Sequence, residues 1–376
     1  MEVNRLKKIL VVDDSALMRR VIFDIINKDR NLHVEKYATN GLDALDLLVS
    51  GEKFDAIVLD INMPKMNGIE FLRELKKRGM NEKVLIVSTL AKEGAKETIQ
   101  ALELGAFDFV TKPDSLAIAK GNLFSNMLLD MLYAAVNLSR RTLDNEVKQQ
   151  AKDHSSIRKT HSIYGKALQG DTSKHSKKPL CGTARKLVAL ACSTGGPKAL
   201  QYVVPFLPAN LDAAVLIVQH MPEGFTASLS NRLDELSRIK VKEAAHGDIL
   251  EKGTVYLAKG GSQMRLIEKG RMQHILSVTA EEARNGLRPC ADIMYESLVG
   301  SSFDEITCVV MTGMGADGTK GIIQLEQKNK IYVIAQDEES STVYGMPKAI
   351  ADAKAVDEVV TLRKIADAIT KHVGVR

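Results

Sequence analysis

The chain has 376 residues, of which 45% are hydrophobic and 26% are charged, and its formal net charge is +5. These values are typical of a soluble globular protein of two or three domains. No apolar run is long enough to span a membrane, and the run at residues 9–12 stops at Asp13 and Asp14, too soon for a secretory signal. The four cysteines include no C-x-x-C pair, which argues against a zinc site or a disulfide framework and favours a cytoplasmic location.

Residues 1–118 alternate short apolar runs with segments of helical periodicity. We predict strands at residues 9–12, 56–59, 84–87 and 107–110, because continuously apolar runs are typical of parallel strands buried on both faces. Helical segments lie between them. The pattern predicts an α/β domain with a flavodoxin-like, five-stranded parallel sheet.

A different composition separates this region from the rest of the chain. Apolar residues between positions 123 and 136 recur at helical spacing and predict one long helix at the end of the first domain. From about residue 144 to residue 181 the pattern gives way to Lys, His, Ser, Thr and Gln. We interpret residues 119–184 as a helix followed by a basic flexible linker, and we favour a solvated tether over metal binding for the linker histidines, which are His154, His161 and His175.

Alternation of strand and helix signals returns in residues 185–376. Strands are predicted at residues 187–191, 214–219, 306–311 and 331–335, and helices at residues 198–206, 225–237, 291–300 and 320–328. Residues 254–278 read as an antiparallel ribbon inserted into this second sheet. The prediction is a doubly wound α/β domain with a mostly parallel sheet.

Polar residues follow four strands of the first domain at their carboxyl ends. Asp13 and Asp14 follow the first strand, Asp60 the third, Ser88 the fourth and Lys112 the fifth. These ends share one edge of a parallel sheet, where ligands bind. Converging carboxylates suit Mg²⁺, and a nearby lysine and hydroxyl suit a phosphoryl group on a carboxylate. The alternative for the Asp pair alone is a helix N-cap.

Together with the run D-x-N-M-P-x-M-N-G from Asp60, these residues make the first 118 positions resemble a response-regulator receiver domain. The resemblance implies that Asp60 accepts a phosphoryl group from a phosphohistidine of a sensor kinase. It also implies that Asp13, Asp14 and Asp60 bind Mg²⁺ with help from the backbone carbonyl of Asn62.

The same resemblance assigns the remaining receiver residues. Ser88 and Lys112 would contact the phosphoryl oxygens, and Phe109 stands where the family has an aromatic switch residue that follows the movement of Ser88. We also expect a cis peptide bond between Lys112 and Pro113.

Three residues of the second domain follow predicted strands in the same way. Ser193 follows the run L-V-A-L-A-C, His220 follows residues 214–219, and Asp317 lies in a glycine-rich loop after residues 306–311. If these strands are parallel in one sheet, the three side chains share an edge and supply a nucleophile, a base and a residue that orients the base. The backbone amides of Thr194 and Met314 are candidates for an oxyanion hole.

Two other interpretations of the serine turn remain open from the residues alone. The sequence S-T-G-G could bind phosphate at a helix N-terminus, although it lacks the lysine of a P-loop. Cys192 is a rival nucleophile, but its position one residue earlier predicts that it points back toward the sheet. His220 could also be a histidine that caps the next helix.

Residues 185–376 resemble the catalytic domain of chemotaxis protein-glutamate methylesterases. The matching segments are S-T-G-G-P from Ser193, Q-H-M-P-E-G-F-T from Gln219, R-P-C-A-D from Arg288, M-T-G-M-G-A-D-G from Met311 and Y-G-M-P-K from Tyr344. Departures from the family pattern fall at Ala191 and Cys192 beside the serine, and at Lys259 and Gln263, which we expect in a loop facing the receptor or the receiver.

The resemblance implies a function for the whole chain. It implies a Ser193–His220–Asp317 esterase that hydrolyses glutamyl methyl esters and deamidates glutamines on chemotaxis receptors, with no metal needed for that step. The receiver would cover the catalytic edge until Asp60 is phosphorylated, which gives sensory adaptation. The expected partners are receptors and a sensor histidine kinase, without nucleic acid or membrane insertion, and the expected state is a monomer.

Two competing classes are a non-catalytic, phosphorylation-gated binding module and a DNA-binding regulator. An intact set of serine, histidine and aspartate argues against the first. The second would need a helix-turn-helix, for which the C-terminal region has no signal.

Overall fold

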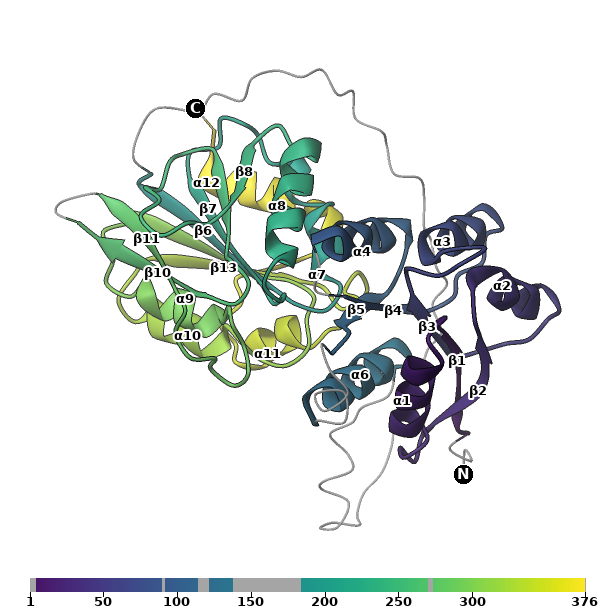
Figure 1. Cartoon of the computed structure of the whole chain (residues 1–376). Helices are drawn as coiled ribbons and strands as arrows, with labels where there is room; N and C mark the ends of the chain where they lie inside the picture. The colour runs from purple at the N-terminus through teal and green to yellow at the C-terminus, as the bar shows by residue number, and fades with distance from the viewer. Residues whose placement is uncertain (1–4, 90–91, 114–121, 138–183, 270–272, 376) are drawn as a thin grey trace, which may run out of the picture.

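The computed structural model describes residues 5–89, 92–113, 122–137, 184–269 and 273–375 (Figure 1). The predicted basic linker and its three histidines lie outside these residues. No helix in the described ranges is both long and apolar enough to cross a membrane.

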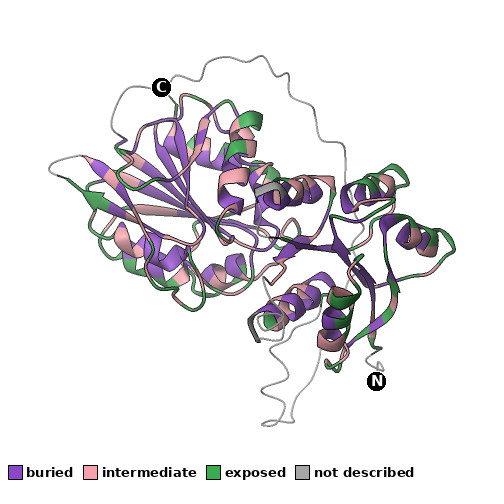
Figure 2. Cartoon of the chain, in the orientation of Figure 1, coloured by how far each residue is buried: buried purple, intermediate pink, exposed green. Residues whose placement is uncertain are grey.

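The N-terminal domain contains a five-stranded parallel sheet, as predicted, in the order β2-β1-β3-β4-β5. Its strands are β1 (Lys7–Val12), β2 (Leu32–Ala38), β3 (Ala56–Asp60), β4 (Val84–Ser88) and β5 (Asp108–Thr111). All the residues of β3 and β4 are buried, which explains their continuously apolar sequence (Figure 2).

Helices cover both faces of this sheet. They are α1 (Ala16–Ile26), α2 (Gly41–Val49), α3 (Gly68–Lys77), α4 (Lys92–Leu104) and α6 (Asn122–Ala135). Ile9 and Val11 of β1 pack in one core with α1 and α6, whereas Leu10 and Val12 pack in the core under α2, α3 and α4. Because successive side chains of a strand point to opposite faces of the sheet, β1 contributes alternate residues to the two cores.

The capping residues decide one alternative left open above. Ser15 is the N-cap of α1, and its side chain accepts a hydrogen bond from the backbone N–H of Met18. The interpretation of the Asp13–Asp14 pair as the N-cap of this helix is therefore wrong. The helix begins one residue later and leaves both carboxylates at the edge of the sheet.

The C-terminal domain contains a seven-stranded parallel sheet in the order β14-β13-β12-β6-β7-β9-β8. Its strands are β6 (Lys186–Cys192), β7 (Ala214–Gln219), β8 (Lys240–Glu243), β9 (Thr254–Leu257), β12 (Glu305–Val310), β13 (Ile331–Gln336) and β14 (Glu358–Val360). A separate antiparallel pair is formed by β10 (Gln263–Glu268) and β11 (His274–Thr279).

The predicted ribbon was placed too early. Residues Thr254–Leu257 pair parallel to both β7 and β8 inside the main sheet, and the ribbon begins only at Gln263. All four residues of β9 are buried, as in an internal strand, and buried and exposed residues do not alternate along it.

The helices of this domain are α7 (Gly196–Leu200), α8 (Phe225–Leu236), α9 (Ala291–Ser297), α10 (Thr319–Glu326), α11 (Met346–Asp352) and α12 (Ile365–Val373), with short 3₁₀ turns at Val204–Phe206 and Leu362–Lys364. The helix predicted at residues 198–206 is interrupted. Pro205 lacks a backbone N–H, so a 3₁₀ turn replaces the α-helix there.

Candidate active site and receiver site

Three aspartates of the N-terminal domain come together at the carboxyl edge of the first sheet. Carboxylate oxygens of Asp13, Asp14 and Asp60 lie within 4.8 Å of one another, with Asp13 and Asp60 buried and Asp14 exposed. Hard, negatively charged oxygens from two adjacent strands fit a divalent cation such as Mg²⁺. Asn62 lies two residues beyond Asp60 and is exposed.

Lys112 balances part of this charge. Its Nζ lies 3.0 Å from Asp13 Oδ2 and 2.8 Å from Asp60 Oδ2. Burial raises the pKa of Asp60, although Lys112 partly opposes that effect. Burial alone would lower the pKa of Lys112, but its attraction to Asp60 and Asp13 outweighs burial and raises it. The lysine therefore stays charged beside the carboxylate that would carry a phosphoryl group.

Ser88 and Phe109 lie on neighbouring strands but point to different surroundings. Ser88 is buried, and its Oγ donates to the carbonyl oxygen of Gly94 at the start of α4, 3.3 Å away. The ring of Phe109 stacks on Phe225, the first residue of α8 in the other domain, with ring centroids 4.7 Å apart. The expected cis bond between Lys112 and Pro113 is wrong: in the described chain the cis bond is Arg288–Pro289.

The second sheet brings the carboxyl ends of three neighbouring strands side by side. Because the order is β12-β6-β7, the residues that follow these strands share one edge. The Nε2 of His220 lies 2.8 Å from Oδ2 of Asp317, and both side chains are largely buried. Burial alone would raise the pKa of Asp317, but His220 and two backbone N–H groups lower it to about 2. The carboxylate is thus ionised and aimed at the imidazole.

Ser193 sits in a tight turn beside this pair. Its N–H donates to the carbonyl oxygen of Thr312 (3.0 Å), and its own carbonyl accepts from the N–H of Gly196 (2.7 Å). Gly195 has a φ of +75°, a conformation that favours glycine. A Cβ at Gly313 would lie 2.9 Å from the Cβ of Ser193, so glycine lets the next loop approach the serine closely.

Comparisons with known proteins match both domains of the chain. A family model described as CheB methylesterase matches residues 188–369, and one described as response regulator receiver domain matches residues 9–119. The protein-glutamate methylesterase/protein-glutamine glutaminase of Bacillus subtilis is 38% identical over 370 residues, which is 97% of this chain and 98% of that protein. The one of Pyrococcus abyssi is 37% identical over 366 residues, which is 97% of this chain and 93% of that protein.

The chain belongs to the protein-glutamate methylesterase family.

Two solved structures are similar to its two halves. The Thermotoga maritima CheB methylesterase catalytic domain is 34% identical and covers 52% of this chain and 100% of that chain, with a TM-score of 0.48. The response regulator domain of Thermotoga maritima CheB is 40% identical and covers 36% of this chain and 99% of that chain, with a TM-score of 0.31.

The backbone around the serine of this methylesterase-family chain leaves two donors available. Among the hydrogen bonds of the described residues, none uses the N–H of Thr194 or of Met314. The N–H of Gly313, in contrast, donates to Val343. Likewise, no hydrogen bond in the described ranges joins Ser193 Oγ to His220. Because Asp317 binds Nε2, the nitrogen of His220 left to accept a proton is Nδ1.

Gln219 was missed from sequence, although it stands beside His220 in the motif. Its Nε2 donates to the carbonyl oxygens of Ser193 (3.0 Å) and His220 (3.2 Å), so one buried amide joins the two strand ends. Its Oε1 accepts from the Sγ of Cys192 (3.0 Å). Burial raises the pKa of that thiol, and Cys192 points back into the core as expected. A buried, protonated thiol is a poor nucleophile.

The other two departures from the family pattern are placed differently from each other. Lys259 is half-buried, whereas Gln263 is fully buried and accepts the N–H of Cys290 at 2.9 Å. The expectation that Gln263 belongs to an outward-facing loop is therefore wrong. The residue lies at the start of β10, and its side chain points inward to satisfy backbone groups.

The receiver contacts the catalytic domain beside the serine turn. Oδ2 of Asp108 in β5 accepts the N–H of Gly195 at 3.0 Å, and Thr194 Oγ1 lies 3.8 Å from Met131 Sδ in α6. Burial raises the pKa of Asp108 to about 6. Farther out, α4 lies beside α8 (Figure 1), and Arg232 pairs with Glu103 at 2.6 Å. Sequence reasoning missed Asp108, which reads as an ordinary polar residue at a strand start.

Proposed function

We propose that this chain is a phosphorylation-activated enzyme that hydrolyses glutamyl methyl esters, and deamidates particular glutamines, on chemotaxis receptors. The observation that carries the proposal is the His220–Asp317 pair, 2.8 Å apart, at the same sheet edge as the Ser193 turn. Full-length similarity to proteins named for these two activities supports it.

In the proposed reaction, Ser193 Oγ attacks the side-chain carbonyl carbon of the methylated glutamate while Nδ1 of His220 takes the hydroxyl proton. Asp317 holds the other ring nitrogen and stabilises the imidazolium that forms. The N–H groups of Thr194 and Met314 donate to the oxyanion. When the C–O bond breaks, His220 returns the proton to the leaving methoxide, and methanol departs.

Water completes the cycle. His220 takes a proton from the water, the resulting hydroxide attacks the acyl-enzyme, and glutamate is released as Ser193 recovers its proton. A glutamine substrate follows the same steps with ammonia as the leaving group, so a single site supports both activities in the relatives' names.

We further propose that the receiver controls this site by covering it. The bond from Gly195 to Asp108 and the contact of Thr194 with Met131 place receiver atoms against the two residues that follow the nucleophile. A receptor helix bundle needs access to that turn. Because the two domains share one chain, even a weak contact suffices to compete with the receptor.

Asp60 is the proposed phosphorylation site, with Asp13, Asp14 and the carbonyl of Asn62 as the residues that would hold Mg²⁺ with it. Mg²⁺ held by these residues would neutralise charge between the carboxylates and the incoming phosphoryl group. Lys112 and Ser88 would bind the phosphoryl oxygens. Ser88 would then leave the carbonyl of Gly94, and this change at α4 and β5 would reach Phe109 and loosen its stack on Phe225.

The proposed partners are methylated receptors as substrate and a sensor histidine kinase as phosphodonor, in the cytoplasm, where receptor signalling helices lie. The reaction they serve would be sensory adaptation.

The test is methanol release from membranes that carry methylated receptors, measured with and without a small phosphodonor and Mg²⁺. We expect release that rises with the phosphodonor, no release by Ser193→Ala, and near-normal release by Cys192→Ala. If Cys192→Ala were inactive and Ser193→Ala active, the nucleophile would be the cysteine. If the unaltered protein bound receptors but released no methanol, the non-catalytic binding module would be the better interpretation.

A further inference from the structure

The carboxylate of Asp317 accepts hydrogen bonds from more than His220. The N–H of Ala291 donates to Oδ2 at 2.6 Å, and the N–H of Asp292 donates to Oδ1 at 3.0 Å. The Sγ of Cys290 lies 3.1 Å from Oδ1, with its thiol as the donor. Each carboxylate oxygen therefore has two donors, and one of the four is a side chain that the reaction scheme does not use.

The thiol of Cys290 is held as a donor by its surroundings. Cys290 is only 1% exposed, and burial, followed by the negative charge of Asp317, raises the pKa of its thiol to about 12. It therefore keeps its proton at neutral pH. Its nearest acceptor is an ionised carboxylate, and a hydrogen bond to a charged acceptor is stronger than one to a neutral acceptor.

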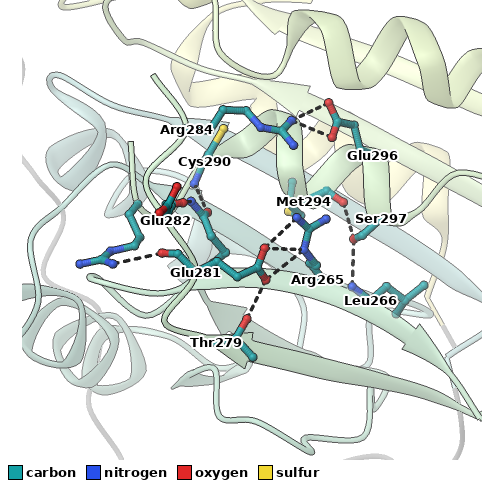
Figure 3. A network of polar contacts seen from close by, with 12 residues as sticks. Arg265, Leu266, Thr279, Glu281, Glu282, Arg284, Cys290, Met294, Glu296 and Ser297 are labelled. Atoms are coloured by element: carbon teal, nitrogen blue, oxygen red, sulfur yellow. Dashed lines mark hydrogen bonds and ion pairs between the residues drawn. The ribbon is translucent and has the colours of Figure 1, made fainter. Parts of the chain in front are cut away.

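The turn that carries Cys290 is fixed on the side of the ribbon. The N–H of Cys290 donates to Oε1 of Gln263, whose Nε2 donates in turn to the carbonyl of Leu287 at 3.1 Å. Around this turn, Arg265 of β10 pairs with Glu281, and Arg284 pairs with Glu296 of α9 (Figure 3). The N–H of Leu266 donates to Oγ of Ser297, which joins the ribbon to α9.

The segment that follows Cys290 also holds the loop that contains Asp317. Oδ1 of Asp292 accepts the N–H groups of Gly318 (2.9 Å) and Gly321 (2.8 Å). Two segments that are distant in sequence thus hold each other through both aspartates. The position of Cys290 relative to Asp317 is set by this exchange and not by the thiol itself.

We propose that Cys290 is a positioning residue whose thiol orients the carboxylate of Asp317 toward His220. The inference rests on the proposed function, because it assigns a role within that triad. The ionisable groups that face Asp317 are His220 from the end of β7, and Cys290, Asp292 and Tyr295 from the start of α9. The Tyr295 hydroxyl donates to the carbonyl of Ala189, which leaves the thiol as the side-chain donor from α9.

The physical consequence concerns how the carboxylate shares its charge. Without the thiol, Oδ1 keeps only the N–H of Asp292, and the carboxylate becomes a stronger acceptor toward His220. The imidazolium is then held more tightly, and the carboxylate plane is less fixed. Cys290→Ser keeps a donor at this place, whereas Cys290→Ala removes it.

The first experiment needs no substrate. The Nε2 proton of His220, bound to Asp317, is followed in the downfield region of the proton NMR spectrum of the full chain and assigned by its loss in His220→Gln. We expect this resonance to move further downfield in Cys290→Ala and to return in Cys290→Ser. Cys308→Ala, which removes a fully buried thiol from β12, is the matched control and should leave it unmoved.

The second experiment measures methanol release from methylated receptors over a range of pH. In Cys290→Ala we expect kcat to fall several-fold with little change in KM, and the acid limb of the kcat/KM profile to move up by about half a pH unit. Cys290→Ser should restore both. Comparison of variants at equal phosphodonor removes any pH effect on the receiver.

The outcomes separate the two proposals. The inference would be overturned if the His220 resonance did not move in a folded Cys290→Ala, or if Cys290→Ala and Cys308→Ala lowered kcat equally. Either result would show that the thiol only fills space. A resonance that moves as expected in a protein that releases no methanol would support the placement of Cys290 and contradict the esterase function.

Discussion

The side chain of Gln219 links the backbones of Ser193 and His220. This side chain is buried at the ends of β6 and β7. Its amide nitrogen donates to two carbonyl oxygens, and its amide oxygen accepts a hydrogen bond from one thiol. The glycine at position 196 makes room for it, because a Cβ there would lie 1.9 Å from Oε1 of Gln219. The amide therefore links the backbone of the Ser193 turn to that of His220.

We predict that Gln219→Met, which keeps the volume and removes the hydrogen bonds, lowers kcat by about tenfold to a hundredfold with a smaller effect on KM, because the two backbones shift relative to each other. The buried groups left without partners should lower the free energy of unfolding by roughly 3 kcal/mol. Methanol release and urea denaturation measure the two effects.

The matched control for that prediction is Cys192→Ala, which removes only the weak thiol donor to Oε1. It should keep most of the activity. Equal losses in both variants would show that the core at this point is sensitive to any change, and that the amide has no special part.

Site residues that directly follow strands could be predicted from the sequence, whereas the residues that form hydrogen bonds with them could not. Ser193, His220, Asp317 and the receiver aspartates stand after apolar runs, and parallel strands deliver such residues to one edge. Asp108 and Gly195 are separated by 87 positions, and nothing local connects them. Cys290 belongs to a motif that sequence reasoning identified, but its thiol could be assigned a partner only after the fold had brought Asp317 beside it.

At the scale of elements, the sequence predicts where strands lie better than it predicts which elements pack against one another. The predicted bounds of β6 and β7 agree with the structure to within a residue or two. The strand β9 was wrongly assigned to the ribbon, although all four of its residues are buried as in an internal strand. The pairing of α4 with α8 across the two domains has no signal in either helix. Both helices are amphipathic, and either could have faced solvent.

That helix pairing makes a prediction. Arg232 of α8 lies 2.6 Å from Glu103 of α4, with side chains 37% and 23% exposed. Because a partly exposed pair is worth about 1 kcal/mol or less, Glu103→Arg should raise unphosphorylated methanol release by roughly threefold to fivefold. The exchange Glu103→Arg with Arg232→Glu should bring release back down.

Glu235 supplies the control for this experiment, because it also pairs with Arg232 but belongs to the same helix. Glu235→Arg changes the charge beside Arg232 without altering the receiver. If it raised unphosphorylated release as much as Glu103→Arg does, the effect would come from α8 itself and not from the contact between domains.

The whole molecule combines attraction and repulsion where the domains meet. Phe109 stacks on Phe225, but burial lowers the pKa of Lys198, and Lys83 and Lys76 of the receiver lower it further. Asp108 is buried at the same contact, and its pKa is raised to about 6. Keeping it ionised at pH 7 therefore costs the folded chain free energy, at about 1.4 kcal/mol for each pH unit by which its pKa is raised.

The sign of the pH effect follows. Asp108 binds its proton more tightly in the buried contact than in water, so its contribution to the contact is most favourable below its ordinary pKa of 3.8 and is lost as the pH rises from there through about 6. Unphosphorylated activity of Asp108→Ala, divided by that of the unaltered protein, should then be larger below pH 6 than well above it. The ratio cancels the pH dependence of the shared catalytic residues. A ratio that stays constant over this range would remove Asp108 from the control of the contact.

The hydrogen bond from Gly195 to Asp108 also bears on how information flows in the opposite direction. If the receiver and a receptor compete for the turn at Gly195, binding of the receptor frees the receiver, just as phosphorylation is proposed to free the turn. Thermodynamic reciprocity then requires that bound receptor shifts the phosphorylation equilibrium of Asp60 toward the phosphorylated form, by the same factor by which phosphorylation strengthens receptor binding. Substrate would thereby act as a co-signal, and the chain would report receptor density together with kinase activity.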